Sequence, residues 1–125
     1  MIGLVGTATA VVTEGVNTAK AVGSGSLDVF ATPMMVALME KAACECIAKD
    51  LEAGQTSVGT EVNVAHVAAS AVGATITATA TVTGIDGRKI EFALTASEGA
   101  KEIGSGTHTR FVVDAQRFMG KLLNM

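Results

Sequence analysis

The sequence predicts an α+β domain in which one long helix is wrapped by a curved antiparallel sheet of about five strands. Three observations lead to this prediction. Residues 32–51 are apolar around most of the helical circumference, as in a helix that is covered on several sides. Four later segments alternate polar and apolar residues with the period of two that strands with one buried face show. Short connections join these segments, so neighbours along the chain must pair antiparallel.

The first part of the chain predicts a strand, a loop and the helix. Residues 3–14 are rich in Thr, Val and Ala and predict a strand. Residues 21–30, AVGSGSLDVF, contain Gly and Ser and predict a mobile loop. The helix is expected to have Thr32 as its N-cap and Pro33 as its first residue, with Gly54 as the stop signal.

The helix carries two neighbouring apolar stripes. They consist of Met35, Leu38, Met39, Ala42 and Cys46, and of Val36, Ala43, Ile47 and Leu51. Glu40 lies within the second stripe. An unpaired buried carboxylate is costly, so Glu40 must be hydrogen-bonded, protonated or turned into a wet cavity. The alternative is that Glu40 and Lys41 form a polar flank that simply meets solvent.

The second part of the chain predicts four strands and a short helix. The strands are 56–67, 74–84, 89–97 and 101–113, and residues 115–125 predict the helix. An Asp-Gly dipeptide at 86–87 marks one of the hairpin turns. In the first of these strands, one face is expected to hold Val58, Thr60, Val62, Val64 and His66.

Composition narrows the class of protein. A chain of 125 residues with 49% hydrophobic residues fits one globular domain, 1–125. The net charge is −3 without a basic run, which argues against nucleic acid or an anionic membrane as the main partner. Cys44 and Cys46 point in different directions on one helix, so no internal disulfide is expected. No Cys/His spacing suggests zinc, and no metal site is expected.

The expected location follows by elimination. No Lys or Arg precedes the apolar start MIGLVGTATAVV, as it would in a signal peptide. No run of about 18 apolar residues predicts a membrane span. The expected location is therefore the cytoplasm.

Three segments resemble one branch of a known fold family. ATPMMVALMEKAA, GQTSVGTEVNVAH and EIGSGTHTR are similar to segments of the fluoroacetyl-CoA thioesterase-like hotdog proteins, and the similarity runs from about residue 28 to the end. The resemblance implies a hotdog homodimer that hydrolyses acyl-CoA thioesters, with coenzyme A as part of the substrate and no separate cofactor. The resemblance also implies that Thr32, Glu40 and His66 are catalytic and that the Gly59 N–H donates a hydrogen bond to the thioester carbonyl.

Each candidate also has a purely structural interpretation. Thr32 is already explained as an N-cap, and a lone histidine at the end of an apolar strand face, such as His66, is commonly structural. Gly59 fits a strand bulge. His108 in the GTHTR segment is expected to be structural and to support the site. The pKa of an ordinary histidine nevertheless suits general acid–base catalysis near neutral pH.

Spacing predicts that the active site is shared between two chains. Thr32 and Glu40 are separated by roughly 12 Å along a helix, and Gly59 and His66 by roughly 23 Å along a strand. Neither pair can close on one thioester from a single straight element. If this strand pairs with its symmetry mate near residues 62–63, Gly59 of one chain approaches the His66 end of the other. The prediction is two composite sites per dimer.

The expected reaction is hydrolysis of a short acyl-CoA. Glu40 would act as general base on water or as nucleophile, Thr32 would position the nucleophile or attack itself, and His66 would donate or relay the proton. The segment 21–29 has no aromatic residue, which argues against an aromatic lid and against selectivity for a small fluorinated acyl group. The cations available for the phosphates of coenzyme A are Arg88, Lys89, Arg110 and Arg117, with ordinary surface charge as the alternative for each.

Three other functions fit the same fold. They are a non-catalytic acyl-CoA or acyl-carrier binding module, a purely structural dimer, and a hydratase or dehydratase, because fold alone does not fix function.

Overall fold

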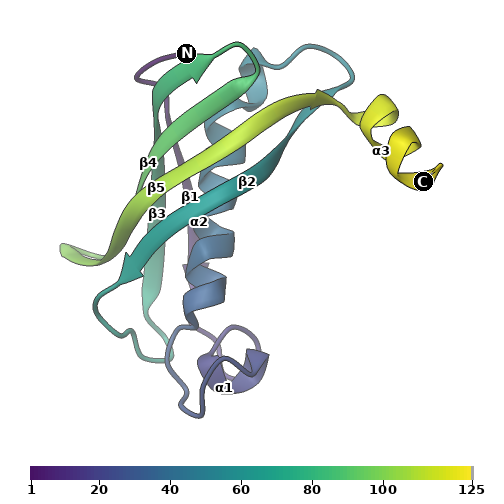
Figure 1. Ribbon diagram of the computed structural model, residues 1–125. Helices are drawn as coiled ribbons and strands as arrows, with labels where there is room; N and C mark the ends of the chain where they lie inside the picture. Colours follow the sequence, from purple (N-terminus) through teal and green to yellow (C-terminus); the bar gives the residue numbers. More distant parts are fainter. Residues whose placement is uncertain (125) are drawn as a thin grey trace.

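A curved sheet and one long helix form the protein, and the computed structural model describes residues 1–124. The strands are β1 (Val5–Val11), β2 (Gln55–His66), β3 (Thr75–Asp86), β4 (Lys89–Glu98) and β5 (Lys101–Asp114). The helices are α1 (Ala19–Val22), α2 (Thr32–Ile47) and α3 (Ala115–Leu123), with a 3₁₀ turn at Ala48–Asp50. Helix α2 lies along one face of the sheet, and the strands bend around it (Figure 1). The predicted α+β architecture is confirmed, but the predicted pairing of β2 with β3 is wrong, because β2 pairs with β5 and β3 pairs with β1.

The sheet leaves strand β2 at an edge. Its order is β1-β3-β4-β5-β2, and every neighbouring pair is antiparallel. β2 pairs with β5 from Gln55 opposite Asp114 to His66 opposite Gly104. Its other side has no neighbouring strand in the sheet order, so a row of backbone N–H and C=O groups is left for another strand.

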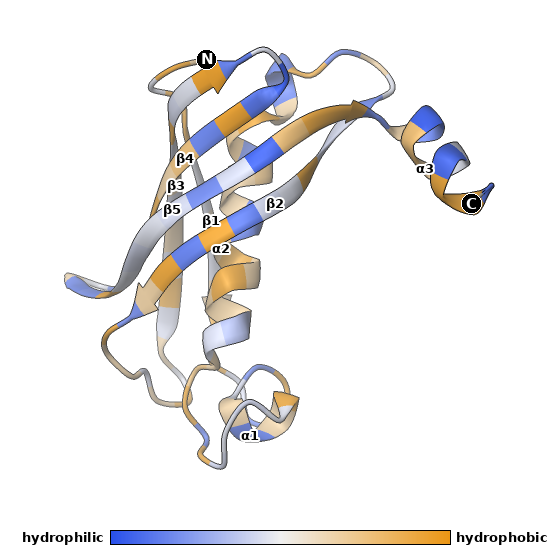
Figure 2. Cartoon of the chain, viewed as in Figure 1, coloured by the Kyte–Doolittle hydropathy of each residue, from blue (hydrophilic) through white to orange (hydrophobic). Residues whose placement is uncertain are grey.

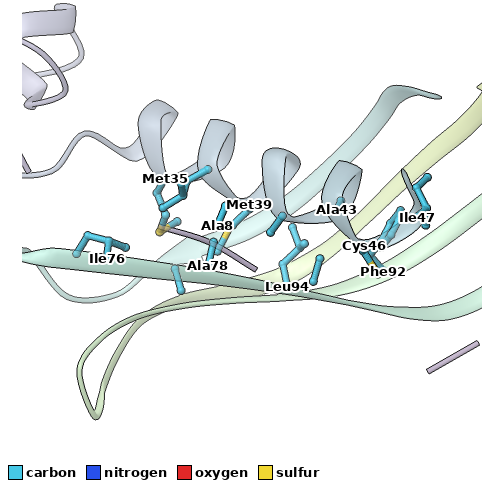
Figure 3. Packing of buried hydrophobic residues seen from close by; sticks show 14 of the residues in the cluster. Ala8, Met35, Met39, Ala43, Cys46, Ile47, Ile76, Ala78, Phe92 and Leu94 are labelled. Atoms are coloured by element: carbon cyan, nitrogen blue, oxygen red, sulfur yellow. The ribbon is translucent and has the colours of Figure 1, made fainter. Parts of the chain in front are cut away.

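The core lies between α2 and the concave face of the sheet. Side chains from α2 point toward the strands (Figure 3), and the buried ones are Met35, Leu38, Met39, Ala42, Ala43, Cys46 and Ile47. The first predicted stripe is therefore buried throughout, whereas Val36 and Leu51 of the second are only half-buried. Strand β1 passes close to the helix, because a Cβ on Gly6 would lie 2.5 Å from the Ala42 carbonyl oxygen. Only glycine allows this approach.

Two details around the start of α2 differ from the prediction. The N-cap of α2 is Ala31, which makes no side-chain capping bond, so Thr32 is already helical and its hydroxyl is used elsewhere. The segment before it contains the four-residue helix α1, which Thr18 caps and which ends at Gly23 with φ of 80°. This turn of helix was missed because Gly and Ser dominated the pattern, although Gly23 is a typical helix-ending residue.

The predicted inner face of β2 is partly wrong, because the strand contains a bulge. The register with β5 shifts between Gly59 and Glu61, so Thr60 is the extra residue and is exposed. A bulge reverses the alternation of side chains beyond it. Gly59 is paired with the inward-facing Arg110, whereas Val58 is paired with Phe111 and belongs to the other face. Val58 and Thr60 therefore do not share the inner face with His66.

Helix α3 stands away from the main body. It begins at the N-cap Asp114, which accepts a hydrogen bond from the Arg117 N–H, and it projects beyond the end of β5 (Figure 1). Hydrophobic and hydrophilic residues alternate around it (Figure 2). Its exposed apolar side chains are Phe118, Met119, Leu122 and Leu123. The predicted helix is confirmed to Leu123, and Met125 lies outside the described residues.

Two further observations concern cysteines and membranes. Cys44 and Cys46 are both free thiols, as predicted. Within residues 1–124, no helix combines the length and the apolar character needed to cross a membrane.

Candidate active site

Thr32 and His66 meet within a single chain. The Thr32 Oγ1 lies 2.8 Å from His66 Nδ1, because the first turn of α2 faces the last residue of β2. A neutral ring with its proton on Nε2 accepts the hydroxyl hydrogen at Nδ1, which is the arrangement of a hydroxyl with an adjacent base. Burial of the ring lowers the pKa of His66 below its usual 6.5, partly opposed by the nearby Ala68 carbonyl. The ring is therefore neutral at physiological pH.

A cavity opens beside this pair. It has a volume of about 250 Å³, and its walls include Thr32, His66, Phe30, Val29 and Ser24. The segment before α2 therefore lies at the cavity. His66 Nε2 is buried and has no hydrogen-bond partner within residues 1–124.

Glu40 lies in a second group of polar side chains, away from Thr32. Its Oε2 accepts a hydrogen bond from Arg110 Nη1 at 3.1 Å and lies 3.9 Å from His108 Nε2. The Glu40 side chain is 38% exposed, whereas Arg110 and His108 are buried. Glu40 is thus a carboxylate held by a buried cation on one side and open to solvent on the other, which settles the question of how the apolar helix tolerates it.

Arg110 has a different role from the ones considered from the sequence. Its Nε donates to Ser57 Oγ at 2.8 Å and its Nη2 to the Ser57 carbonyl at 2.9 Å, in addition to the bond with Glu40. It is 6% exposed. The side chain is therefore neither an ordinary surface charge nor free to hold a phosphate. Strand alternation could have indicated that Arg110 is buried, because Arg110 shares its strand face with His108 and Val112.

Gly59 lies directly beneath the Glu40 group. A Cβ at this position would lie 2.6 Å from Glu40 Oε2, 3.1 Å from Arg110 Nη1 and 3.2 Å from His108 Cε1. The absent side chain is what gives these three groups their space. The bulge at Thr60 turns Gly59 and His66 to the same face, although an odd number of positions separates them.

The predicted site residues thus form two groups in one chain. Thr32 and His66 lie at one end of the inner face of β2, and Glu40 and Gly59 lie toward its other end. Within residues 1–124, no group of three or more His, Cys, Asp or Glu residues could hold a metal ion.

Comparison with known proteins identifies the family. Residues 12–116 match the family model described as fluoroacetyl-CoA-specific thioesterase. The fluoroacetyl-CoA thioesterase of Streptantibioticus cattleyicolor is 43% identical over 95 residues, which are 76% of this chain and 68% of the relative.

Solved structures agree with this match. A crystal structure of a variant of the fluoroacetyl-CoA-specific thioesterase in complex with fluoroacetate and CoA has a TM-score of 0.86 and 35% identity over 94% of this chain and 98% of the other. A thioesterase superfamily member from Thermus thermophilus, at 23% identity, shares the fold with a TM-score of 0.88 over 99% of this chain and 91% of the other. The predicted hotdog fold and thioester hydrolase class are confirmed, and the chain belongs to the fluoroacetyl-CoA-specific thioesterase family.

Proposed function

We propose that the protein hydrolyses short acyl-CoA thioesters in two composite sites of a homodimer. The observation that carries this proposal is the division of the four predicted residues into two groups along β2, a strand with a free edge. One group holds a hydroxyl and a neutral histidine at 2.8 Å. The other holds an anchored carboxylate above a glycine whose backbone is open to close approach. The first group lacks a carboxylate and an open backbone N–H, and the second lacks a hydroxyl paired with a neutral histidine.

Pairing of β2 with its symmetry mate brings the groups together. When two copies of this strand align antiparallel near Val62 or Asn63, the Gly59 end of one copy lies beside the His66 end of the other. The exposed apolar face of α3 supports a dimer as well. In Figure 1, α3 projects on the side of the free edge of β2, where the second copy would lie.

The chemistry follows from the two groups. The Gly59 N–H polarises the thioester carbonyl, and Glu40 takes a proton from the attacking water or attacks the carbonyl carbon itself. Collapse of the tetrahedral intermediate breaks the C–S bond, and the sulfur leaves with a proton that His66 relays. Thr32 positions the nucleophile or attacks in place of water, and on either covalent route a water molecule then hydrolyses the acyl-enzyme. The products are the free acid and coenzyme A.

The acyl group in this proposal is short and general. Phe30 is the one aromatic wall of the cavity beside Thr32, and residues 21–29 contain no aromatic side chain. The name of the family thus describes its relatives more narrowly than we propose for this chain.

Of the four cations considered for binding the coenzyme A phosphates, Arg88 and Arg117 remain candidates. Arg110 is bound to Glu40 and Ser57, and Lys89 lies 3.3 Å from Glu91. Arg88 and Arg117 border a surface hollow of about 170 Å³ together with Lys121. These three basic side chains, with the Asp114 carboxylate beside them, surround a hollow where a phosphate could bind.

A panel of acyl-CoA substrates, assayed by release of free thiol, tests the proposal. We expect turnover of acetyl-, propionyl- and butyryl-CoA, and loss of most of it in Glu40→Gln and His66→Ala. Full activity in either folded variant would overturn the assigned roles. Thermal stabilisation by CoA esters without any turnover would favour a binding module instead. Single-turnover hydrolysis in labelled water separates the acyl-enzyme route from direct water attack.

A further inference from the structure

Two hydrogen bonds together fix the protonation state of His108. Its Nδ1 lies 2.8 Å from the Glu61 carbonyl oxygen, which can only accept, so Nδ1 carries the proton. Its Nε2 lies 3.3 Å from Arg110 Nη1, which can only donate, so Nε2 carries a lone pair. The Arg110 contact requires a neutral ring, and the Glu61 contact places its one proton on Nδ1. The ring is 1% exposed and stacks on Phe92 with 5.7 Å between ring centroids.

The neutral ring of His108 orients the hydrogens on Arg110 Nη1. Nη1 has two hydrogens, and its two acceptors are His108 Nε2 at 3.3 Å and Glu40 Oε2 at 3.1 Å. Ser57 takes hydrogens from Nε and Nη2 on the other side of the guanidinium. When the lone pair of Nε2 occupies one Nη1 hydrogen, the other is directed at the carboxylate.

We propose that His108 is a positioning residue for the Glu40 carboxylate, acting through Arg110. The Glu61 carbonyl holds the tautomer, the tautomer presents an acceptor to Arg110, and Arg110 holds Glu40 beneath the point where the thioester must bind. Glu40 and Arg110 are the charged groups that face the ring. A second proton on the ring would remove the acceptor, and it would add a cation beside Arg110. Burial opposes that change, and it lowers the pKa of His108.

A matched pair of substitutions separates this role from simple packing. In His108→Gln the side-chain carbonyl can reach the position of Nε2 and accept from Arg110. In His108→Asn the shorter amide can replace the Nδ1–H bond to Glu61 but offers Arg110 no acceptor. Both variants remove the ring and its stacking on Phe92. Phe92→Leu serves as a third variant, which weakens the packing and leaves the acceptor in place.

The expected result is a difference between the two amides. We expect His108→Asn to lower kcat about tenfold with KM changed less than about twofold, His108→Gln to keep most of kcat, and Phe92→Leu to affect Tm rather than kcat. All rates are measured on the dimer at a temperature where every variant is folded. Equal kcat in Asn and Gln variants would overturn the inference. So would ¹⁵N NMR showing the neutral ring protonated at Nε2.

This inference rests on the proposed role of Glu40, and the two can fail separately. If Glu40→Gln retains full activity, the proposed function is wrong whatever the His108 variants do. If Glu40→Gln is inactive and the two His108 amides are equal, only the positioning role is wrong. The NMR measurement needs no activity.

Discussion

Replacing Gly59 with alanine should displace the Glu40 carboxylate while leaving the backbone N–H in place. The new Cβ would lie 2.6 Å from Glu40 Oε2, and ordinary contact begins at 3.4 Å, so the oxygen must retreat by about 0.8 Å. Its bond to Arg110 Nη1, now 3.1 Å, would lengthen or turn. A catalytic group misplaced by about 1 Å can cost about 100-fold in rate.

We therefore expect kcat to fall by about 10- to 100-fold, equivalent to about 1.4–2.7 kcal/mol of transition-state stabilisation. The assay is thiol release at saturating substrate, with circular dichroism to confirm the fold. Gly84→Ala is the matched control. Gly84 also lies at a strand bulge, and its Cβ would meet the exposed Glu91 carboxylate at 3.2 Å, where the side chain can swing away. That variant should keep its activity.

A second-site change sharpens the prediction. In Gly59→Ala combined with Glu40→Asp, the shorter acid leaves room for the methyl group, so part of the lost rate should return relative to Gly59→Ala alone. If the folded Gly59→Ala variant keeps the parent kcat, the crowding between Cβ and carboxylate does not control catalysis, and the reasoning fails.

Three other predictions follow from the same contacts. Thr32→Ala should lower kcat/KM about 100-fold by removing the hydroxyl from His66, and Thr32→Ser should restore most of it; equal loss in both variants would contradict this. The pKa values of His66 and His108 in the folded protein lie below 6.5, so below that pH the unfolded chain binds more protons than the folded one. The free energy of unfolding should therefore stay level above about pH 6.5 and fall as the pH drops through the lower folded pKa values. Urea titrations from about pH 8 to about pH 5 check this, and a pH-independent midpoint would refute it. Finally, Arg88→Ala with Arg117→Ala should raise KM for acyl-CoA about tenfold and leave an acyl-pantetheine, which lacks the phosphates, unaffected; equal changes for both substrates would exclude a phosphate role.

The fold was predictable because its strongest signals are local and repeated. Alternation in β3 and β4, the short turns before and after β4 and an apolar α2 predict the helix and the antiparallel β3-β4-β5 part of the sheet. The edge position of β2 does not follow from chain order, because the short connection between β2 and β3 predicts that they pair, whereas β2 pairs with β5 and β3 with β1. The four-residue α1 was missed because it is too short to show a period, and its cap at Thr18 and stop at Gly23 are common residue types.

The site was predictable in residue identity but not in arrangement. Gly59 is a sequence signal of a bulge, but the alternating face of this strand was assigned without one, so Val58 was placed on the wrong face and Gly59 was separated from His66. Arg110 was considered as a phosphate ligand because its charge was weighed without the alternation of its strand, which places it on the face of His108 and Val112. Its burial depends on Ser57 and Glu40, which lie 53 and 70 positions away. Contacts at such separations depend on the assembled sheet, and local pattern does not encode them.

Complementation between two inactive variants tests the composite site most directly. His66→Ala and Glu40→Gln chains are unfolded together and refolded as a mixture, and native mass spectrometry measures the heterodimer. A heterodimer contains one intact site, with His66 from one chain and Glu40 from the other, so random mixing should restore about one quarter of the parent activity. If heterodimers form and activity stays at the level of the separate variants, both groups belong to one chain's site and the account is wrong.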